Sequence, residues 1–253
     1  MKKVITFALQ KGGTGKTSSA GSVAVELTTK GFKVLAIDGD PQGNLSTWLA
    51  GESFQYELAD VLMKKCDPHE AIIQSKQLEK LFFLPTATLG STLRLYSKTL
   101  ANQEPFAVKH LLKTIKDDFD FIIIDTSPAF GALEESCFLA SDETITVLKI
   151  DEFSSDGLIT FLDNIENLKE RYDTEKPKMN KIILNERDLR LVQQKDYIEK
   201  ITSSINVNFS IIPVDQAFKK AQSIHIPIQM LEGTKPETLK VISDLAESLI
   251  TEE

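Results

Sequence analysis

A short loop rich in glycine and lysine constrains this chain more than any other feature of its sequence. It reads Lys-Gly-Gly-Thr-Gly-Lys-Thr over residues 11–17 and joins an apolar run, Val4–Leu9, to a helical pattern that starts near Thr17. Glycines let the backbone curl so that successive N–H groups point inward, and a helix N-terminus adds a partial positive charge at the same point. The loop therefore predicts a phosphate-binding turn between a first strand and a first helix.

The side chains of this loop fit the same chemistry. Lys16 can reach the outer phosphates of a nucleotide, and the Thr17 hydroxyl can bind Mg²⁺. The residues expected to contact the phosphates are Lys11, Gly12, Gly13, Thr14, Gly15, Lys16, Thr17 and Ser18.

Short apolar runs alternate with amphipathic helical patterns along the rest of the chain. Runs that are apolar on both sides are typical of a parallel sheet covered on both faces, and the alternation implies right-handed crossover units. We predict an α/β fold with a doubly wound, mostly parallel sheet flanked by helices, as one domain over residues 1–253 that carries the phosphate loop. Strands are expected at Val4–Leu9, Lys33–Ile37, Phe119–Ile124, Thr144–Ile150, Lys181–Leu184 and Val207–Ile212, with Leu81–Leu84 a weaker seventh.

Carboxylates follow two of these strands. Asp38 and Asp40 come after Lys33–Ile37, and Asp125 comes after the apolar run Phe121–Ile124. Ligands of such sheets bind at the carboxyl ends of the strands, so these side chains are expected beside the phosphate loop, near a magnesium ion. An alternative is that Asp40 only caps a helix beginning near Asn44.

Together these motifs resemble the deviant Walker A group of P-loop ATPases, which includes ParA, MinD and the nitrogenase iron protein. The usual P-loop pattern opens with a glycine where this chain has Gln10, whereas a second lysine, here Lys11, is typical of the group. Residues 38–46 are similar to the DxDPQGN segment of ParA proteins. Residues 125–128 resemble the family's D-T-P-P, with Ser127 in place of the first proline.

The resemblance implies ATP and Mg²⁺ as cofactors and a homodimer with ATP at its interface. Lys16 and Asp40 are then catalytic, Asp40 by orienting the attacking water. Lys11 is catalytic from across the interface, where it contacts the partner's nucleotide. Thr17, Asp38 and Asp125 are implied at the metal, Asp38 in its outer shell.

Further resemblances cover most of the chain. Asn185 stands where the family contacts adenine, and Pro213 begins a second loop on the adenine side. Residues 151–153 look like the segment after the fourth main strand, and residues 221–228 resemble the closing A-x-S-x-x-x-P-[VI] motif.

The charge distribution bears on a nucleic-acid partner. The net charge is −8, with 16 acidic and 3 basic residues over 117–175 but 8 basic and 5 acidic residues over 178–220. Only the second region suits a polyanion. The resemblance implies non-specific DNA binding through scattered basic side chains. The candidates are Lys181, Arg187, Arg190, Lys219 and Lys220, although Val214 stands where the family often has arginine.

Gln10 favours the ParA branch over the MinD branch, whose members end in a basic membrane helix. Residues 235–253 hold two lysines and five acidic residues, which favours no attraction to an anionic membrane. The stripe of Leu239, Ile242, Leu245 and Leu249 is instead expected to face the core. A cytoplasmic, nucleoid-associated protein without a membrane partner is the expectation.

The predicted function is an ATP-dependent dimerising switch for plasmid or chromosome segregation. Its slow hydrolysis is stimulated by a partner protein, and its ATP state binds DNA. One alternative is a ParA-like ATPase that positions a protein cargo or scaffold without touching DNA. Another is a redox protein that holds an iron–sulfur cluster through Cys66 and Cys137, although Cys137 lies farther from Asp125 than in the family.

Overall fold

The computed structural model describes residues 2–51, 53–151 and 154–251, with the backbone alone for 154–156. In this part of the chain the strands form one sheet of order β3-β4-β2-β5-β1-β6-β7-β8. All neighbouring strands pair in parallel except β3 and β4. The predicted doubly wound, mostly parallel sheet is confirmed. The strands are β1 (Lys3–Ala8), β2 (Val34–Gly39), β3 (Ile73–Gln74), β4 (Leu81–Leu84), β5 (Phe121–Thr126), β6 (Glu143–Lys149), β7 (Lys178–Arg187) and β8 (Asn208–Pro213).

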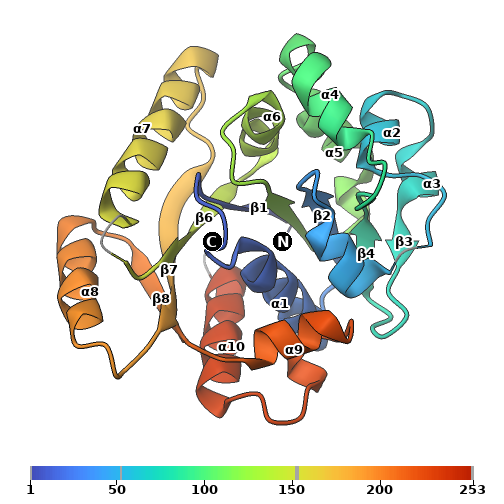
Figure 1. The fold of residues 1–253 in the computed structure, drawn as a ribbon. Coiled ribbons are helices and arrows are strands. Elements are labelled where there is room, and N and C mark those ends of the chain that lie inside the picture. The colour runs from blue at the N-terminus through green and yellow to red at the C-terminus, as the bar shows by residue number, and fades with distance from the viewer. Residues whose placement is uncertain (1, 52, 152–153, 252–253) are drawn as a thin grey trace.

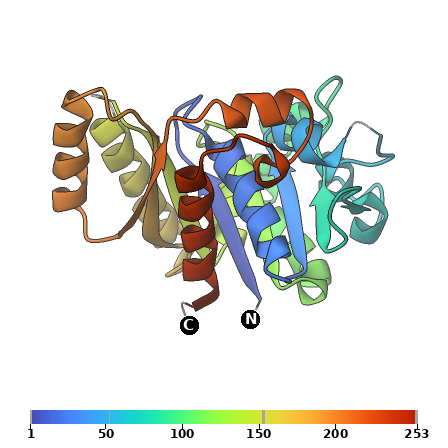
Figure 2. The same cartoon turned by 90° about the horizontal axis from the view of Figure 1, so that it is seen from below.

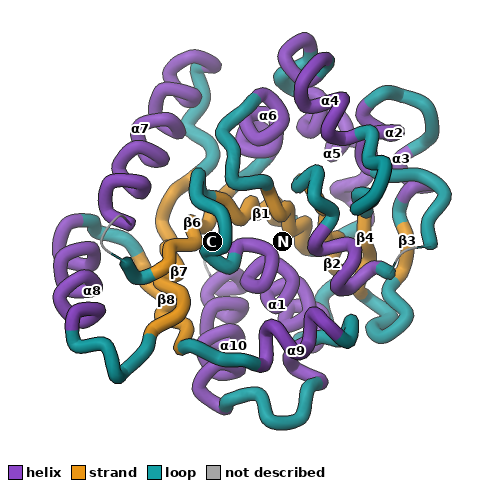
Figure 3. The backbone as a smooth tube through the Cα atoms, viewed as in Figure 1, coloured by secondary structure: helices purple, strands orange, loops and turns teal. Residues whose placement is uncertain are grey.

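Helices cover both faces of the sheet (Figure 1), and the tube view separates the layers clearly (Figure 3). Helices α1 and α10 pack on one face, whereas α5, α6 and α7 pack on the other. Seen from below, α1 and α10 lie side by side, and the start of β1 and the end of α10 share one edge of the molecule (Figure 2). The helices are α1 (Lys16–Thr29), α2 (Leu58–Leu62), α3 (Pro68–Ala71), α4 (Leu93–Thr99), α5 (Ala107–Ile115), α6 (Ala132–Ala140), α7 (Ser154–Tyr172), α8 (Gln193–Ser204), α9 (Ala217–Ser223) and α10 (Pro236–Thr251), with short turns η1 (Ser46–Ala50), η2 (Ala101–Gln103), η3 (Lys116–Asp118) and η4 (Ile228–Met230).

The central strand β1 shows how the sequence creates two cores. Its side chains alternate across the sheet, so Ile5 and Phe7 enter the cluster under α1 and α10, while Val4 enters the cluster under α5 and α6. Both sets are buried, which explains why this strand is a continuous apolar run. Truncating the fully buried Phe7 to alanine is expected to cost about 3–5 kcal/mol of stability.

The expected strands lie close to their observed bounds, and the weaker candidate at Leu81–Leu84 is β4. Two differences stand out. Strand β7 begins at Lys178 instead of Lys181, and the two-residue strand β3 was not expected.

The expected helical stripes are also in place. Leu158, Phe161, Ile165 and Leu168 of α7 are buried, with Leu162 partly buried. In α10 the side chains of Ile242, Leu245 and Leu249 are buried and Leu239 is partly buried, so this stripe faces the core as predicted. Among the described helices, none has the length and apolar character that a bilayer crossing requires.

Candidate nucleotide-binding site

The phosphate loop lies at the carboxyl end of β1, between β5 and β6 in the sheet. Strands β2 and β5 lie on one side of β1, and β6 lies on the other side. The chain therefore crosses from one side of β1 to the other between β5 and β6. Such a reversal of strand order creates a crevice for ligands. Helix α1 begins at Lys16, directly after the loop, so the helix N-terminus faces this crevice.

Two glycines in the loop adopt backbone angles that other residues avoid. Gly13 has φ of 70° and Gly15 has φ of 97°, both in the left-handed region. A Cβ atom on Gly15 would lie 2.2 Å from Nδ2 of Asn185, so position 15 has no room for a side chain. That amide donates a hydrogen bond of 2.8 Å to the carbonyl of Thr14 and thereby ties the loop to the end of β7.

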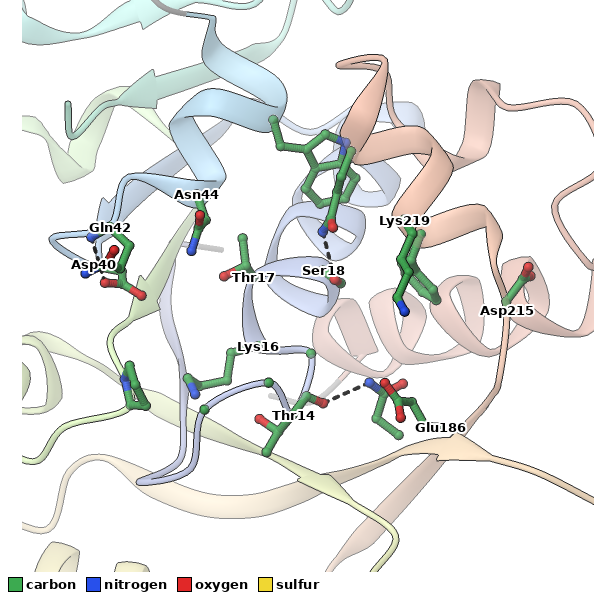
Figure 4. A pocket seen from close by; sticks show the side chains of 18 of the residues that line it. Thr14, Lys16, Thr17, Ser18, Asp40, Gln42, Asn44, Glu186, Asp215 and Lys219 are labelled. Atoms are coloured by element: carbon green, nitrogen blue, oxygen red, sulfur yellow. Dashed lines mark hydrogen bonds between the residues drawn. The ribbon is translucent and has the colours of Figure 1, made fainter. Parts of the chain in front are cut away.

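A cavity of about 680 Å³ opens over the loop, a size typical of small-molecule sites. Figure 4 shows Asp40 and Gln42 on one side of it and Lys219 and Asp215 on the other, with Lys16 and Thr17 between them. The predicted site residues that line it are Gly12, Gly13, Thr14, Gly15, Lys16, Thr17, Ser18, Asp40, Asn185, Pro213 and Lys219.

Three buried carboxylates and one buried lysine give the site its electrostatic character. Lys16 is 7% exposed, and burial lowers its pKa although Asp125 and Asp40 oppose the shift. Burial raises the pKa of Asp125 well above its usual range, and the nearby charge of Asp38 adds to this. Because these carboxylates crowd together out of water, the site gains stability when a cation joins them.

Asp38 connects the site to the loop that follows β2. Its carboxylate accepts hydrogen bonds of 2.8 Å from the backbone of Ser46 and 2.7 Å from the Ser46 hydroxyl. Its carbonyl accepts a hydrogen bond from the hydroxyl of Thr86, in the loop that follows β4. Burial raises the pKa of Asp38 to about 7 despite these donors. The position supports an indirect role at the metal, because Ser46 already occupies one oxygen.

Asp40 points into the cavity. Its carboxylate accepts a hydrogen bond of 2.9 Å from the backbone of Gln42, which closes a tight turn over residues 40–42. No hydrogen bond joins the Asp40 carboxylate to Asn44 in the described part of the chain, and its backbone contact is instead with Gln42, two residues on. Burial raises the pKa of Asp40, with Lys16 acting in the opposite direction.

The residues present fit a magnesium ion. Both carboxylate oxygens of Asp125 are buried without a hydrogen-bond partner among the described residues, a costly arrangement unless a ligand completes it. The Thr17 hydroxyl lies near enough to lower the pKa of this carboxyl. Hard oxygen donors of this kind suit Mg²⁺, which typically takes one or two protein ligands and otherwise water and phosphate.

Lys11 points away from the loop that contains it. Its ammonium lies 2.6 Å from the carboxylate of Asp151, at the end of β6, and the side chain is 37% exposed. The carbonyl of Lys11 accepts a hydrogen bond of 2.8 Å from Lys16. The two lysines therefore point in different directions: the side chain of Lys16 is directed inward, and that of Lys11 toward the surface. Glu152 and Phe153, the rest of that segment, lie outside the described residues.

Sequence reasoning missed several residues on the side of the cavity formed by the ends of β7 and β8 and by α9. Gln222 of α9 donates a hydrogen bond of 2.9 Å to the hydroxyl of Ser18, and so connects α9 to the phosphate loop. Glu186, Asp215 and Phe218 also line the cavity. Gln222 lies inside the closing motif over residues 221–228, which was the only sequence indication of this contact.

The candidate DNA-binding residues separate into two groups. Arg187, Arg190 and Lys220 line one groove of about 710 Å³ next to the nucleotide cavity, while Lys219 lines the nucleotide cavity itself. The prediction for Lys181 is wrong, because its side chain is 2% exposed and lies 3.2 Å from Glu143 inside the sheet. A lysine buried against a carboxylate cannot contact DNA.

The Ser127 hydroxyl, where the family has proline, donates a hydrogen bond to the buried carboxylate of Glu134 at the start of α6. The same carboxylate accepts a bond of 3.0 Å from the backbone of Gly131. These contacts fasten both ends of the turn over 127–131, which brings Pro128 to the cavity wall.

Fold and site together define a P-loop nucleoside triphosphatase with a second lysine in its loop. The pattern of the AAA domain family matches residues 2–181, and the chain belongs to this family. The prediction that it is a ParA-like ATPase is confirmed.

The chain is also similar to individual proteins, in sequence to two of them and in fold to a third. The chromosome-partitioning ATPase Soj of Treponema pallidum is 28% identical over 237 residues, 92% of this chain and 91% of Soj. The cell division protein PomZ of Myxococcus xanthus is 35% identical over 162 residues, 63% of this chain but only 50% of PomZ. An ATP complex of Cyanothece McdA shares the fold with a TM-score of 0.87 and 21% identity, covering 99% of this chain and 97% of McdA.

Proposed function

We propose that this chain is an ATP-dependent dimerising switch for DNA segregation. The observation that carries the proposal is that two lysines of one loop point in different directions. Lys16 is buried over the phosphate-binding cavity, while Lys11 reaches outward and remains partly exposed. A partly exposed lysine at the start of the loop is suited to reach a nucleotide held by another subunit.

In this proposal ATP and Mg²⁺ are the cofactors. The backbone of the loop and Lys16 hold the phosphates, and Asn185 and Pro213 border the base. Asp125 and Thr17 hold Mg²⁺, with Asp38 behind them. The ion supplies neutralisation of the charge that builds on the phosphate oxygens during hydrolysis.

Asp40 is the proposed water-orienting residue. Its carboxylate is held by the backbone of Gln42, so its position is fixed before a nucleotide arrives. Lys11 of the second subunit adds a positive charge at the transferred group, as an arginine finger does, where such a charge contributes about 10³–10⁵ in rate. Hydrolysis therefore depends on pairing of two subunits. A stimulating partner protein can then control the rate of hydrolysis by acting on the dimer.

DNA binding is proposed through the groove lined by Arg187, Arg190 and Lys220. The guanidinium of Arg190 is shared with Asp188 at 2.6 Å, which reduces its charge toward DNA. Lys220 is exposed on α9 without an ion pair among the described residues, so it is the strongest of the three. Binding through few cations is weak and falls steeply with salt.

The test is retention of the protein on duplex DNA in ATP and in ADP across a salt series. We expect retention in ATP only, loss of retention in Lys220→Glu, and little change in Lys200→Glu, an exposed lysine of α8. Equal retention in both nucleotides, or none at low salt, removes DNA from the proposal. The ATPase would then position a protein cargo or scaffold, and the reduced charge of Arg190 already favours this second function.

The redox alternative receives no support from the cysteines. Cys137 is 1% exposed and belongs to the core under α6, so its thiol cannot reach a cluster between two subunits. Cys66 is a free, partly buried cysteine near α3.

A further inference from the structure

A basic pocket lies at the amino ends of the strands, at the edge of the sheet opposite to the nucleotide site. It has a volume of about 320 Å³ and is formed where β1, β5 and β6 begin beside α5. Strand β1 starts at this pocket with Lys3 and ends at Ala8 before the phosphate loop, which separates the two sites by about 20 Å. Its lining holds six lysines and two aspartates, a balance of +4 in a chain of net charge −8. The lysines are Lys2, Lys3, Lys109, Lys113, Lys116 and Lys176.

Half of these lysines are neutralised locally. The carboxylate partners come from η3 and from the start of β6 with the residue before it, and each pair joins two segments of the amino edge. The pairs are Lys2 with Asp117 at 2.7 Å, Lys3 with Glu143 at 2.7 Å and Lys176 with Asp142 at 2.5 Å.

The other half forms a stripe along α5 and into η3, the turn that follows it. Lys109, Lys113 and Lys116 are spaced by four and three residues, so they share one exposed helix face. The opposite face of α5 carries the apolar residues that pack on the sheet. Lys109 lies 5.6 Å over the ring of Phe106, while Lys113 and Lys116 form no ion pair within the described residues. No acidic residue occurs within α5 to balance them. Lys109 and Lys113 therefore present charge that no acidic residue of the helix balances, while Lys116 lies close enough to Asp117 to help lower the pKa of that carboxyl.

The floor of the pocket is apolar. Side chains from the starts of the strands and from α5 and α6 close it from below, and all of them are buried. They are Val4, Leu112, Phe119, Ile122 and Leu139. A ligand in this pocket meets ammonium groups at the rim and hydrocarbon below.

We propose that this basic pocket binds an acidic peptide segment of a partner protein, with an apolar residue between its acidic side chains. Ammonium groups pair with the carboxylates, and the apolar residue covers the floor. From Lys109 to Lys116 the stripe extends for about 10 Å, which matches about three residues of extended peptide.

Duplex DNA fits this pocket less well. Its backbone presents phosphates and sugars and has no hydrocarbon side chain that could fill the floor, and Asp117, which is 75% exposed, remains among the lysines and opposes a continuous line of phosphates. A peptide can place its carboxylates beside the lysines and avoid that position.

The experiment measures fluorescence anisotropy of a labelled peptide of nine residues, with glutamate and leucine alternating, against the full chain at low ionic strength. One variant is Lys113→Glu with Lys116→Glu. The matched control is Lys195→Glu with Lys200→Glu, which changes the charge equally on two exposed positions of α8. Two further probes are the same peptide with serine in place of leucine and a labelled DNA duplex. Circular dichroism establishes that each variant is folded.

We expect saturable binding to the parent, a loss of about tenfold or more in the α5 variant and a change below about twofold in the α8 control. The serine peptide should bind more weakly than the leucine peptide. Absence of binding to the parent, or equal loss in both variants, overturns the proposal. Tighter binding of the duplex than of the peptide, lost in the α5 variant, also overturns it and makes the pocket a nucleic-acid site. None of these readouts depends on ATP.

Discussion

The ammonium of Lys11 lies 2.6 Å from the carboxylate of Asp151, so the second lysine of the phosphate loop already has a partner within its own subunit. In the proposed dimer that lysine must serve the nucleotide of the other subunit. The internal pair and the intersubunit contact therefore compete for one charge.

Replacing Asp151 with asparagine is expected to strengthen ATP-dependent dimerisation. A partly exposed ion pair contributes about 0.2–1 kcal/mol, and a symmetric dimer would release two of them, so the dimer dissociation constant should fall by about 2- to 30-fold. Sedimentation equilibrium with ATP and Mg²⁺ measures this. In a Lys11→Ala background, which is expected to stay at the single-chain mass, the same change should not restore a dimer. A weaker dimer in Asp151→Asn would mean that Asp151 holds Lys11 in its working position.

The two ends of the phosphate loop should differ in their tolerance of a methyl group. Gly15→Ala places a Cβ against Asn185 at a residue of positive φ, whereas no atom lies within 4 Å of a Cβ on Gly12. We expect Gly15→Ala to destabilise the ligand-free protein by about 2 kcal/mol or more and Gly12→Ala to change it by less than about 1 kcal/mol. Urea unfolding without nucleotide measures both. Equal stability of the two variants would contradict the described contact with Asn185.

The bond between Ser127 and Glu134 should replace the stiffness that the family obtains from proline. Ser127→Ala leaves a buried carboxylate with one donor fewer and is expected to cost about 1–3 kcal/mol. Unfolding experiments measure this cost, and steady-state kinetics should show a lower kcat with little change in KM for ATP. Ser127→Pro should retain more activity than Ser127→Ala. The opposite order would show that the turn depends on the hydroxyl for another reason.

The stability of the ligand-free protein should depend on pH through Asp38. Burial raises the pKa of Asp38 from 3.8 to about 7, so the folded state holds the proton more tightly than the unfolded chain does. The ionised carboxylate therefore penalises folding above pH 7, and the penalty fades as the pH falls from 7 toward 3.8.

Asp38→Asn removes this penalty. It should stabilise the protein most near pH 8, with an advantage that shrinks by about 1.4 kcal/mol per pH unit below the folded pKa. Urea unfolding of both proteins across the pH range, without Mg²⁺, is the measurement. Asp117→Asn serves as the control, because the bond to Lys2 lowers the pKa of Asp117. This replacement should therefore change the stability of the protein in the opposite direction, with a loss above the unfolded pKa. An advantage independent of pH would contradict the raised pKa.

Much of the fold and of the phosphate loop could be predicted because their causes are local. Continuous apolar runs mark strands buried on both faces, and glycines with lysines in a fixed register mark the loop. Long-range contacts gave no such indication. Asn185 was expected at the adenine, yet its bond to Thr14 joins positions 171 residues apart.

The burial of Lys181 also depends on contacts between distant parts of the chain. As a basic residue in a basic region it was expected at the surface. The pairing of β6 with β7 buries it against Glu143, and that register depends on the whole sheet. Charge counted along the chain therefore cannot distinguish a surface lysine from a buried one.

The most direct test of the central claim is the mass of the protein in solution, measured by light scattering, with Mg²⁺ and either ATP or ADP. We expect twice the 28.2 kDa of one chain in ATP and 28.2 kDa in ADP, with Lys11→Ala at the single-chain mass in both. A parent protein that keeps the single-chain mass in ATP, or a Lys11→Ala variant that doubles its mass as the parent does, would contradict it.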